Sequence, residues 1–335
     1  MATMKQVAKA ANVSIATVSR VINKTGYVSP DLEVRVQEAM DKLAYLPSSL
    51  ARSLRMQETR TIGVLIPQLN QPFFSTLAFA IEKSLFAQDY RALICSAEED
   101  GDKERSYVDM FLRQRVDGVV VVPTGHSSQT LLPLMNNGTP MVMVDRYLKG
   151  FTVNQVFSDN VSGAYQGMRH LLELGHRRIS VIGTSHYSEP MNDRLKGIDR
   201  ALAEHGGDIV IEHFMSDTLQ HFEMGYDTAK QVLTRDSRPT AIFALMDVIA
   251  IGIMHAAAEL HMSIPHDLSV IGFDDIPLSS FSIPTLTTVA QPIYEMGEVA
   301  AGLLLKSFSD DVVTVETITL DTQLMIRQST ASPQT

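Results

Sequence analysis

The stretch Val7-Ala8-Lys9-Ala10-Ala11-Asn12-Val13-Ser14-Ile15-Ala16-Thr17-Val18-Ser19-Arg20-Val21-Ile22-Asn23 decides the fold of the first part of this chain. Apolar residues recur in it at helical spacing, first over residues 4–11 and again after Ser14. Asn12 suits a turn between two helices because its side chain tolerates left-handed backbone, and Ser14 is a favourable N-cap. The pattern therefore predicts a helix-turn-helix. The residues expected to be buried in it are Val7, Ala8, Ala11, Val18, Val21 and Ile22.

The second of these helices begins with small residues that are followed by an arginine. When such a helix lies in the major groove of DNA, its leading turn reaches the base edges. We expect Ala16 to contact a thymine methyl and Arg20 to donate two hydrogen bonds to a guanine. Thr17, Ser19 and Asn23 suit phosphate or sugar contacts, which position a protein without reading sequence. The DNA-binding residues predicted here are Ser14, Ile15, Ala16, Thr17, Ser19, Arg20 and Asn23.

A third helix is expected to follow, with Ser29 as its N-cap and Pro30 at its first position. An ordinary helical hairpin inside a larger domain is the alternative interpretation of the two preceding helices. The third helix favours a separate headpiece, residues 1–46, with a three-helix core. The apolar side of this helix is expected to comprise Val34, Met40 and Leu43, together with Leu32 and Val36.

Several segments resemble a known headpiece. Lys5-Gln6-Val7-Ala8, residues 13–23, Val28-Ser29 and Ala44-Tyr45-Leu46-Pro47 closely resemble the lactose/galactose repressor family of bacterial transcription regulators, in its ribose- and purine-repressor-like branch. The resemblance covers essentially the full chain. It implies a homodimer in which each headpiece reads one half-site of a pseudo-palindromic, double-stranded DNA operator.

Residues 47–60 resemble the hinge and linker of that family. The resemblance implies a short helix that folds on the operator and inserts Leu54 into a minor-groove step. A helix of this length is marginal alone, and an apolar wedge kinks the duplex at the cost of unstacking. A plain basic linker is the alternative. The DNA-binding residues that the resemblance implies here are Ser49, Arg52, Leu54 and Arg55.

The charge of the chain is divided unevenly. The 335 residues carry a net charge of −10, yet residues 1–60 hold nine Lys and Arg against five Asp and Glu. The remainder therefore holds 19 basic against 33 acidic residues, so nucleic acid is expected to meet only the basic head. A single cysteine, Cys95, excludes a disulfide framework. Without a signal peptide or an apolar stretch of ~20 residues, we expect a cytoplasmic protein with no membrane contact.

From residue 61 onward, short apolar runs alternate with amphipathic segments. Apolar strands of this kind are buried on both faces, which predicts parallel sheets covered by helices. About ten such units exceed one sheet, so we predict an α/β body of two doubly wound lobes. The expected strands are 61–67, 91–96, 118–123, 141–145, 179–183, 241–245 and 268–273, and the expected helices lie near 74–88, 103–114, 161–174, 192–205, 223–234, 248–260 and 293–307.

The family resemblance implies a fold like that of the periplasmic sugar-binding proteins, in which the chain crosses between the lobes three times. We expect these crossings near Asp159, Gln291 and Leu320. The ligand-binding and dimerisation body, residues 61–330, is then divided into a first lobe of about 61–159 plus 291–320 and a second lobe of about 160–290 plus 321–330.

An enzyme with a doubly wound fold is the serious alternative for the body. Its usual signatures are missing, because residues 68–73 after the first strand do not form a glycine-rich phosphate loop. The sequence has no HExxH motif, no paired Cys-x-x-Cys and no nucleophile elbow. We therefore expect no catalytic residues, no cofactor and no metal site. A transport-type binding protein is a further alternative, which the headpiece opposes.

Ligands of open parallel sheets bind beyond the carboxyl ends of the strands. Amide, carboxylate and guanidinium groups follow several of the predicted strands, beside aromatic rings. This mixture suits a sugar, whose hydroxyls need paired donors and acceptors while its C–H faces stack on rings. Asn70 and Asp247 are also suited to capping the helices that follow them. The predicted ligand-binding residues are Asn70, Phe73, Phe74, Asp145, Arg146, Arg194, Asp247, Asp274 and Gln291.

The identity of the ligand stays open. Residues 70–74 (Asn-x-Pro-Phe-Phe), 144–146 (Val-Asp-Arg) and 272–274 (Gly-Phe-Asp) resemble a pentose-binding pattern. Many relatives have Asn-Asp where this chain has Met246-Asp247, which removes one amide contact and suits a less polar ligand edge. The sequence thus predicts a sequence-specific transcriptional repressor controlled by a small sugar bound between two lobes. A purine or nucleoside corepressor, stacked on the Phe73-Phe74 pair, is the alternative, as is an enzyme fused to a DNA-binding head.

Overall fold

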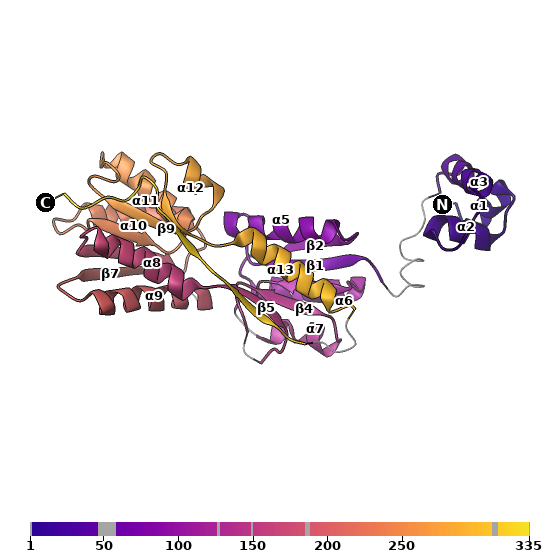
Figure 1. The fold of residues 1–335 in the computed structure, drawn as a ribbon, viewed down its shortest axis with the longest axis horizontal. Helices are drawn as coiled ribbons and strands as arrows, with labels where there is room; N and C mark the ends of the chain where they lie inside the picture. Colours follow the sequence, from indigo (N-terminus) through magenta and orange to yellow (C-terminus); the bar gives the residue numbers. More distant parts are fainter. Residues whose placement is uncertain are drawn as a thin grey trace. The chain divides into compact units, whose positions relative to one another are not determined.

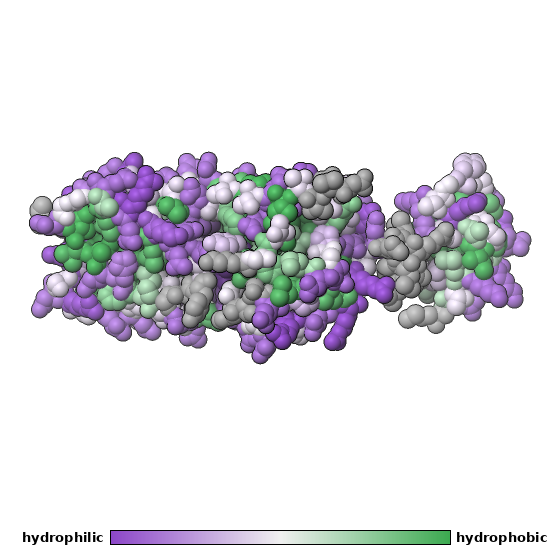
Figure 2. Space-filling view, turned by 90° about the horizontal axis from the view of Figure 1, so that it is seen from below, coloured by the Kyte–Doolittle hydropathy of each residue, from purple (hydrophilic) through white to green (hydrophobic). Residues whose placement is uncertain are grey.

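The computed structural model describes residues 2–45, 58–125, 128–148, 150–184, 188–309 and 314–334. The chain divides into two compact units (Figure 1), a head of residues 1–60 and a body of residues 61–335. Among the described residues, no helix combines the length and the hydrophobicity that a membrane span requires. Figure 2 shows that one face of the molecule is largely hydrophilic, with separate apolar areas over both halves of the body.

The head is a helix-turn-helix followed by a third helix. Helix α1 (Met4–Ala11) ends at Asn12, whose φ of 52° is left-handed, and α2 (Ile15–Asn23) begins after Ser14, whose Oγ accepts from the Thr17 amide at 3.0 Å. Both predicted roles are confirmed. Helix α3 (Pro30–Lys42) begins at the expected proline. Its Arg35 donates to the Ala11 carbonyl at 2.6 Å, which ties the third helix to the end of the first.

The core of the head differs in part from the prediction. The prediction buries Val34, but 57% of its surface is exposed. Val36 is buried as predicted, and Ala39, which was not predicted, is buried beside it. The stripe Val36, Ala39, Met40 and Leu43 follows the helical spacing that places side chains on one face, and Val34 falls outside it. The fully buried residues of this core are Val7, Ala8, Ala11, Val18, Val36 and Ala39, with Val21 and Ile22 half-buried beside them.

The body contains two six-stranded sheets, one in each lobe. The lobe 1 sheet has the order β11-β5-β4-β3-β1-β2, and the lobe 2 sheet has the order β12-β10-β9-β8-β6-β7. All neighbours are parallel except β10 and β12. The strands are β1 (Thr61–Ile66), β2 (Arg91–Ser96), β3 (Gly118–Val121), β4 (Met141–Val144), β5 (Asn154–Ser158), β6 (Arg178–Thr184), β7 (Val210–Ser216), β8 (Ala241–Ala244), β9 (Ser269–Asp274), β10 (Thr287–Ala290), β11 (Thr317–Leu320) and β12 (Gln323–Met325).

Helices cover both faces of each sheet. In lobe 1, Val64 packs with α5 and α13 on one face while Leu65 packs with α6 and α7 on the other. In lobe 2, Val181 faces α8 and α9 and Ile182 faces α10 and α11. The α/β fold with two doubly wound lobes is confirmed. The helices are α5 (Pro72–Phe86), α6 (Gly101–Gln114), α7 (Leu132–Asn136), α8 (Asn160–Glu173), α9 (Glu189–His205), α10 (His221–Leu233), α11 (Asp247–Glu259), α12 (Pro277–Phe281) and α13 (Ile293–Lys306).

Three connections join the lobes. They lead from β5 to α8, from β10 to α13 and from β11 to β12. The first and third are bonded to each other, since Asp159 donates its amide to the Leu320 carbonyl at 2.8 Å and accepts from the Thr322 hydroxyl at 2.9 Å. The lobes therefore meet along a short bundle of connections rather than through a continuous sheet.

The close packing of α10 on α11 gives a direct test of the lobe 2 core. A Cβ on Gly252 would lie 2.2 Å from the Phe222 carbonyl oxygen, whereas a Cβ on Gly302 of α13 would meet nothing within 4 Å. We expect Gly252→Ala to lower the free energy of unfolding by about 3 kcal/mol or more, because helix backbones must separate. Gly302→Ala is the control and should raise it by up to about 1 kcal/mol. Urea unfolding measures both, and equal stabilities of the two variants would contradict the packing described here.

Candidate functional site

A cavity of about 270 Å³ lies between the two lobes, at the carboxyl ends of strands from both sheets. Its size is that of a small-molecule site. Lobe 1 contributes residues that follow β1, β2, β3 and β4, and lobe 2 contributes residues that follow β6, β7, β8 and β9. The lining residues are Gln68, Gln71, Phe73, Phe74, Glu99, Thr124, Asp145 and Arg146 from lobe 1, and Thr184, Ser188, Pro190, Met191, Arg194, Asp217, Leu219, His221, Met246 and Asp274 from lobe 2.

Six of the nine predicted ligand-binding residues line this cavity: Phe73, Phe74, Asp145, Arg146, Arg194 and Asp274. Asn70 does not, because it lies exposed in the turn before α5. Gln291 lies one contact away, where its Nε2 donates to Asp274 at 2.7 Å.

Asp247 also lies outside the cavity. Its carboxylate is fully buried in lobe 2, where it accepts from the Ile276 amide at 2.9 Å, from the Ser279 hydroxyl at 2.7 Å and from the Thr288 hydroxyl at 2.5 Å. Gly272 leaves room for it, since a Cβ there would lie 2.1 Å from its Oδ1. Burial raises the pKa of Asp247 to about 6, against the three donors. This residue supports the loop after β9 and does not face a ligand.

An ion pair forms part of the lobe 1 wall. Arg146, which follows β4, donates to both carboxylate oxygens of Glu99 at 3.0 and 2.9 Å and lies 5.5 Å from the centre of the Phe74 ring. The Asp145 carboxylate is 3.8 Å from the Arg146 Nε. Burial raises the pKa of Asp145, while Arg146 and Arg194 oppose that rise. The pairing keeps charged groups at the cavity in a fixed geometry.

Three of the five buried side-chain polar atoms without a hydrogen-bond partner among the described residues lie on the same wall, and the other two, Ser180 Oγ and Gln291 Oε1, belong to residues outside the cavity lining. Gln68 Oε1, Thr124 Oγ1 and Arg146 Nε are buried and have no hydrogen-bond partner in the part of the chain that the structure describes. All three belong to residues that line the cavity from lobe 1. Buried polar atoms in folded proteins are generally bonded, so unsatisfied ones at a cavity indicate the place of a polar ligand or ordered water.

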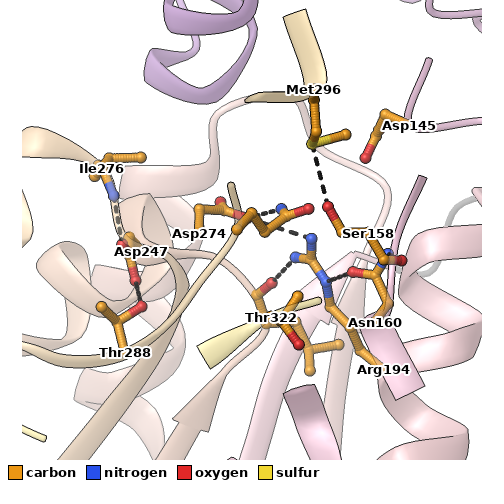
Figure 3. Close-up of polar contacts among 12 residues, drawn as sticks. Asp145, Ser158, Asn160, Arg194, Asp247, Asp274, Ile276, Thr288, Met296 and Thr322 are labelled. Carbon is orange, nitrogen blue, oxygen red and sulfur yellow. Dashed lines mark hydrogen bonds and ion pairs between the residues drawn. The ribbon is translucent and has the colours of Figure 1, made fainter. Parts of the chain in front are cut away.

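Arg194 of α9 joins the cavity to the connections between the lobes (Figure 3). Its Nε donates to Asn160 Oδ1 at 2.9 Å, another nitrogen donates to the Leu245 carbonyl, and its Nη2 lies 3.3 Å from Asp274 Oδ1. The guanidinium also lies 3.8 Å from the centre of the Phe273 ring. Burial raises the pKa of Asp274, an effect that Arg194 opposes. Asn160 and Gln291, which bond to Arg194 and Asp274, lie on two of the connections between the lobes. A ligand that contacts Arg194 or Asp274 is therefore one residue away from these connections.

Some lining residues had escaped the sequence prediction, and most follow strand ends as the rule for parallel sheets requires. Glu99 and Thr124 follow strands that had been predicted, so the same rule would have found them. His221 follows the unpredicted β7, and in the structure it contacts the Gln71 amide of lobe 1 across the cavity. The residues missed are Gln68, Gln71, Glu99, Thr124, Thr184, Ser188, Pro190, Met191, Asp217, Leu219, His221 and Met246.

The predicted DNA-contacting residues of the head are distributed over the start and one side of α2. Ser14, Ile15, Ala16 and Arg20 are exposed, and 48% of the Ile15 surface is accessible. Thr17, Ser19 and Asn23 are half-buried, and the Asn23 amide donates back to the Ser19 carbonyl at 2.8 Å. The hinge candidates Ser49, Arg52, Leu54 and Arg55 lie outside the described residues.

Comparisons with known proteins match both units. Residues 3–48 match the model of bacterial regulatory proteins of the lacI family, and residues 168–330 match a periplasmic binding protein-like domain. The ribose operon repressor of Halalkalibacterium halodurans is 37% identical over 98% of this chain and 97% of its own length. The transcriptional repressor PurR of Glaesserella parasuis is 33% identical over 98% of both chains.

Solved structures agree with the same assignment. A LacI family regulator from Enterococcus faecium with bound ribose superposes with a TM-score of 0.74 and 32% identity, covering 81% of this chain and 99% of that one. The lac repressor dimer bound to operator and the anti-inducer ONPF gives 0.86 and 26%, covering 98% and 99%. A helix-turn-helix head on a two-lobed body with an interlobe cavity defines a DNA-binding transcriptional regulator. The chain belongs to the lacI family of bacterial regulatory proteins.

Proposed function

We propose that this repressor changes its affinity for an operator when a small sugar binds in the cavity between the lobes. The observation that carries the proposal is the set of buried, unpartnered polar atoms on lobe 1, beside the Arg146–Glu99 pair and the Phe74 ring. Sugar hydroxyls both donate and accept, so they can satisfy such atoms together. A C–H face of the same sugar can lie against the aromatic ring.

The relatives support two ligand classes. The ribose operon repressor and the ribose-bound regulator favour a pentose, whereas the relatives named PurR favour a purine. A purine would stack on the Phe73–Phe74 pair, whose ring centres are 5.2 Å apart and nearly perpendicular. The paired charges at Arg146 and Glu99 favour hydroxyls, because each hydroxyl can both donate and accept a hydrogen bond, whereas each polar group of a purine does only one of these.

We infer that the body dimerises through an apolar surface formed by α5, α12 and the residues after it. Thr76 of α5 and Ser280 of α12 line one shallow hollow, so these helices are neighbours across the lobes. Phe79 and Phe86 of α5 are exposed, as are Phe281 of α12 (80%) and Ile283 just after it (97%). Exposed apolar groups of this size in a folded body favour a second copy as their partner.

On this proposal, the two heads of the dimer bind the half-sites of a pseudo-palindromic operator. Residues 47–60 act as the hinge, with Ser49, Arg52, Leu54 and Arg55 as DNA contacts and residues 1–46 as the headpiece. We propose that the chain works by binding rather than by catalysis, a proposal supported by the Arg146–Glu99 and Arg194–Asp274 ion pairs and by relatives that are named as repressors. Because a repressor meets its operator on the bacterial chromosome, the cytoplasm is the compartment proposed.

Calorimetric titration of the full chain tests the ligand proposal. Ribose, arabinose, xylose and glucose are compared with hypoxanthine and guanine. For whichever sugar binds, Arg146→Met should lower the affinity by about 10- to 150-fold, which is the effect of losing a hydrogen bond to a charged group. Arg113→Met, at an exposed arginine of α6 outside the cavity, should leave it unchanged. If only purines bind, the sugar proposal is wrong and the purine alternative is supported. If Arg146→Met binds the ligand as tightly as the normal chain does, this cavity is not the binding site.

A further inference from the structure

We infer that the effector is a deoxy sugar, with hydroxyls toward lobe 1 and a CH₂ or CH₃ group toward lobe 2. The inference rests on the proposed sugar effector and narrows its chemical class. It follows from a difference in polarity between the two walls of the cavity. Each wall is formed by residues at the carboxyl ends of parallel strands, but the side chains on the two walls differ.

The lobe 1 wall is the polar one. It holds Gln68, Thr124 and Arg146, each with a buried polar atom that has no hydrogen-bond partner among the described residues, although the Arg146 Nε lies 3.8 Å from the Asp145 carboxylate. These three residues follow β1, β3 and β4, which are consecutive in the sheet order β4-β3-β1. Donors and acceptors without partners are thus spread along one continuous edge of the lobe 1 sheet.

The lobe 2 wall has apolar residues at the corresponding strand ends. Pro190 and Met191 follow β6, Leu219 follows β7 and Met246 follows β8, and these strands are consecutive in the order β8-β6-β7. Met191, in the first turn of α9, is buried in the core that this helix shares with α8, and Met246 packs against both cores of this lobe. The side chains of Met191 and Met246 are therefore held in place by packing, whereas Leu219 is 39% exposed.

The strongest polar groups of lobe 2 are already bonded within the protein. Arg194 donates to Asn160, to the Leu245 carbonyl and to Asp274, and Asp274 also accepts from Gln291. His221 is in contact with Gln71 of lobe 1. Thr184, Ser188 and Asp217 complete the polar lining of this lobe. A ligand hydroxyl directed at Met191, Leu219 or Met246 would lose its hydrogen bonds to water without replacement.

The cost of burying a hydroxyl without a hydrogen-bond partner determines how strongly the cavity should favour a deoxy sugar. An apolar pocket discriminates against an added hydroxyl by a factor on the order of 100 at most. We therefore expect a deoxy sugar to bind about 10- to 100-fold more tightly than the parent sugar that carries one more hydroxyl at the same carbon.

Titration calorimetry on the full chain tests this with pairs of sugars that differ by one hydroxyl. The pairs are D-ribose with 2-deoxy-D-ribose, D-galactose with D-fucose and L-mannose with L-rhamnose. In the pair that binds, the deoxy member should bind about tenfold or more tightly. Equal or tighter binding of the parent sugar overturns the deoxy inference and leaves the sugar proposal intact. Binding of arabinose, xylose or glucose but of none of these six sugars overturns the deoxy inference alone. Binding of no sugar in either set, by protein that still binds DNA, overturns both.

Met246→Asn tests the wall itself. An amide at this position gives the extra hydroxyl a partner, so the ratio of the two affinities should shift toward the parent sugar by about tenfold or more. Met191→Gln is the second variant, in case the first lowers stability. Met135→Asn, at an exposed methionine of α7 outside the cavity, is the matched control and should not change the ratio. A ratio unchanged in both cavity variants contradicts the proposed role of the apolar wall.

Discussion

Replacing Arg194 with methionine is expected to abolish effector binding and to lower the free energy of unfolding of the body by about 3–5 kcal/mol. The guanidinium is buried and holds Asn160, the Leu245 carbonyl and Asp274 at once. Its removal leaves the Asp274 carboxylate buried without its counter-charge. It also removes the contact that joins two of the three connections between the lobes, the one at Asn160 and the one at Gln291. Chemical denaturation and calorimetric titration measure the two effects.

Two further variants separate this role from a general loss of charge. Arg200→Met removes an exposed arginine of the same helix that pairs with Glu204 at 2.9 Å, and it should leave the free energy of unfolding nearly unchanged, because exposed ion pairs are screened by water. Combining Arg194→Met with Asp274→Asn should recover part of the lost stability, because the unpaired carboxylate is gone. If the double variant is no more stable than Arg194→Met alone, the ion pair does not explain the effect.

Replacing Arg20 with alanine is expected to relax the operator preference of the head at one base position by about 1–3 kcal/mol, or about 5- to 150-fold. Arg20 is an exposed residue of α2, whose N-terminus is fixed by Ser14 and whose core contact is Val18. An arginine so placed can pair with the two acceptors of a guanine in the major groove. Selection of binding sites from a random duplex pool, by the normal chain and by the variant, measures the change in preference.

Lys42→Ala, at the exposed end of α3, is the control for the loss of one positive charge from the head. It should weaken binding to all sequences alike, if it has any effect, and should leave base preference unchanged. Uniform weakening by Arg20→Ala as well, with the selected sequence unaltered, would show that Arg20 contacts phosphate and not a base.

The sequence predicted the helices of the head well because strong local signals mark their ends. The start of α2 depends on the Ser14 cap, and the end of α1 depends on Asn12 in left-handed conformation. The face of α3 was predicted less well. Ala39 is buried while Val34 is exposed. Alanine gives little hydrophobic signal, so the spacing that it completes was easy to overlook.

In the body, one missed strand has a clear physical cause. Strand β7 lies at the edge of its sheet and exposes Glu212 and His213, so it lacks the apolar run of a central strand. Because β7 was not predicted, the residues that follow it, including Leu219 and His221, were not assigned to the site. The direction of a side chain at a strand end is set by tertiary contacts. Asp247 turns into the lobe because Gly272 leaves space for it, which the local sequence does not reveal.

The central claim is that the cavity and the DNA-reading head are thermodynamically coupled. The most direct test measures the affinity of the full chain for its selected duplex with and without saturating effector, and the affinity for the effector with and without that duplex. The account predicts that both affinities change by the same factor, about 5- to 150-fold, since coupling between two sites is reciprocal. Two affinities that are each independent of the other ligand would contradict it.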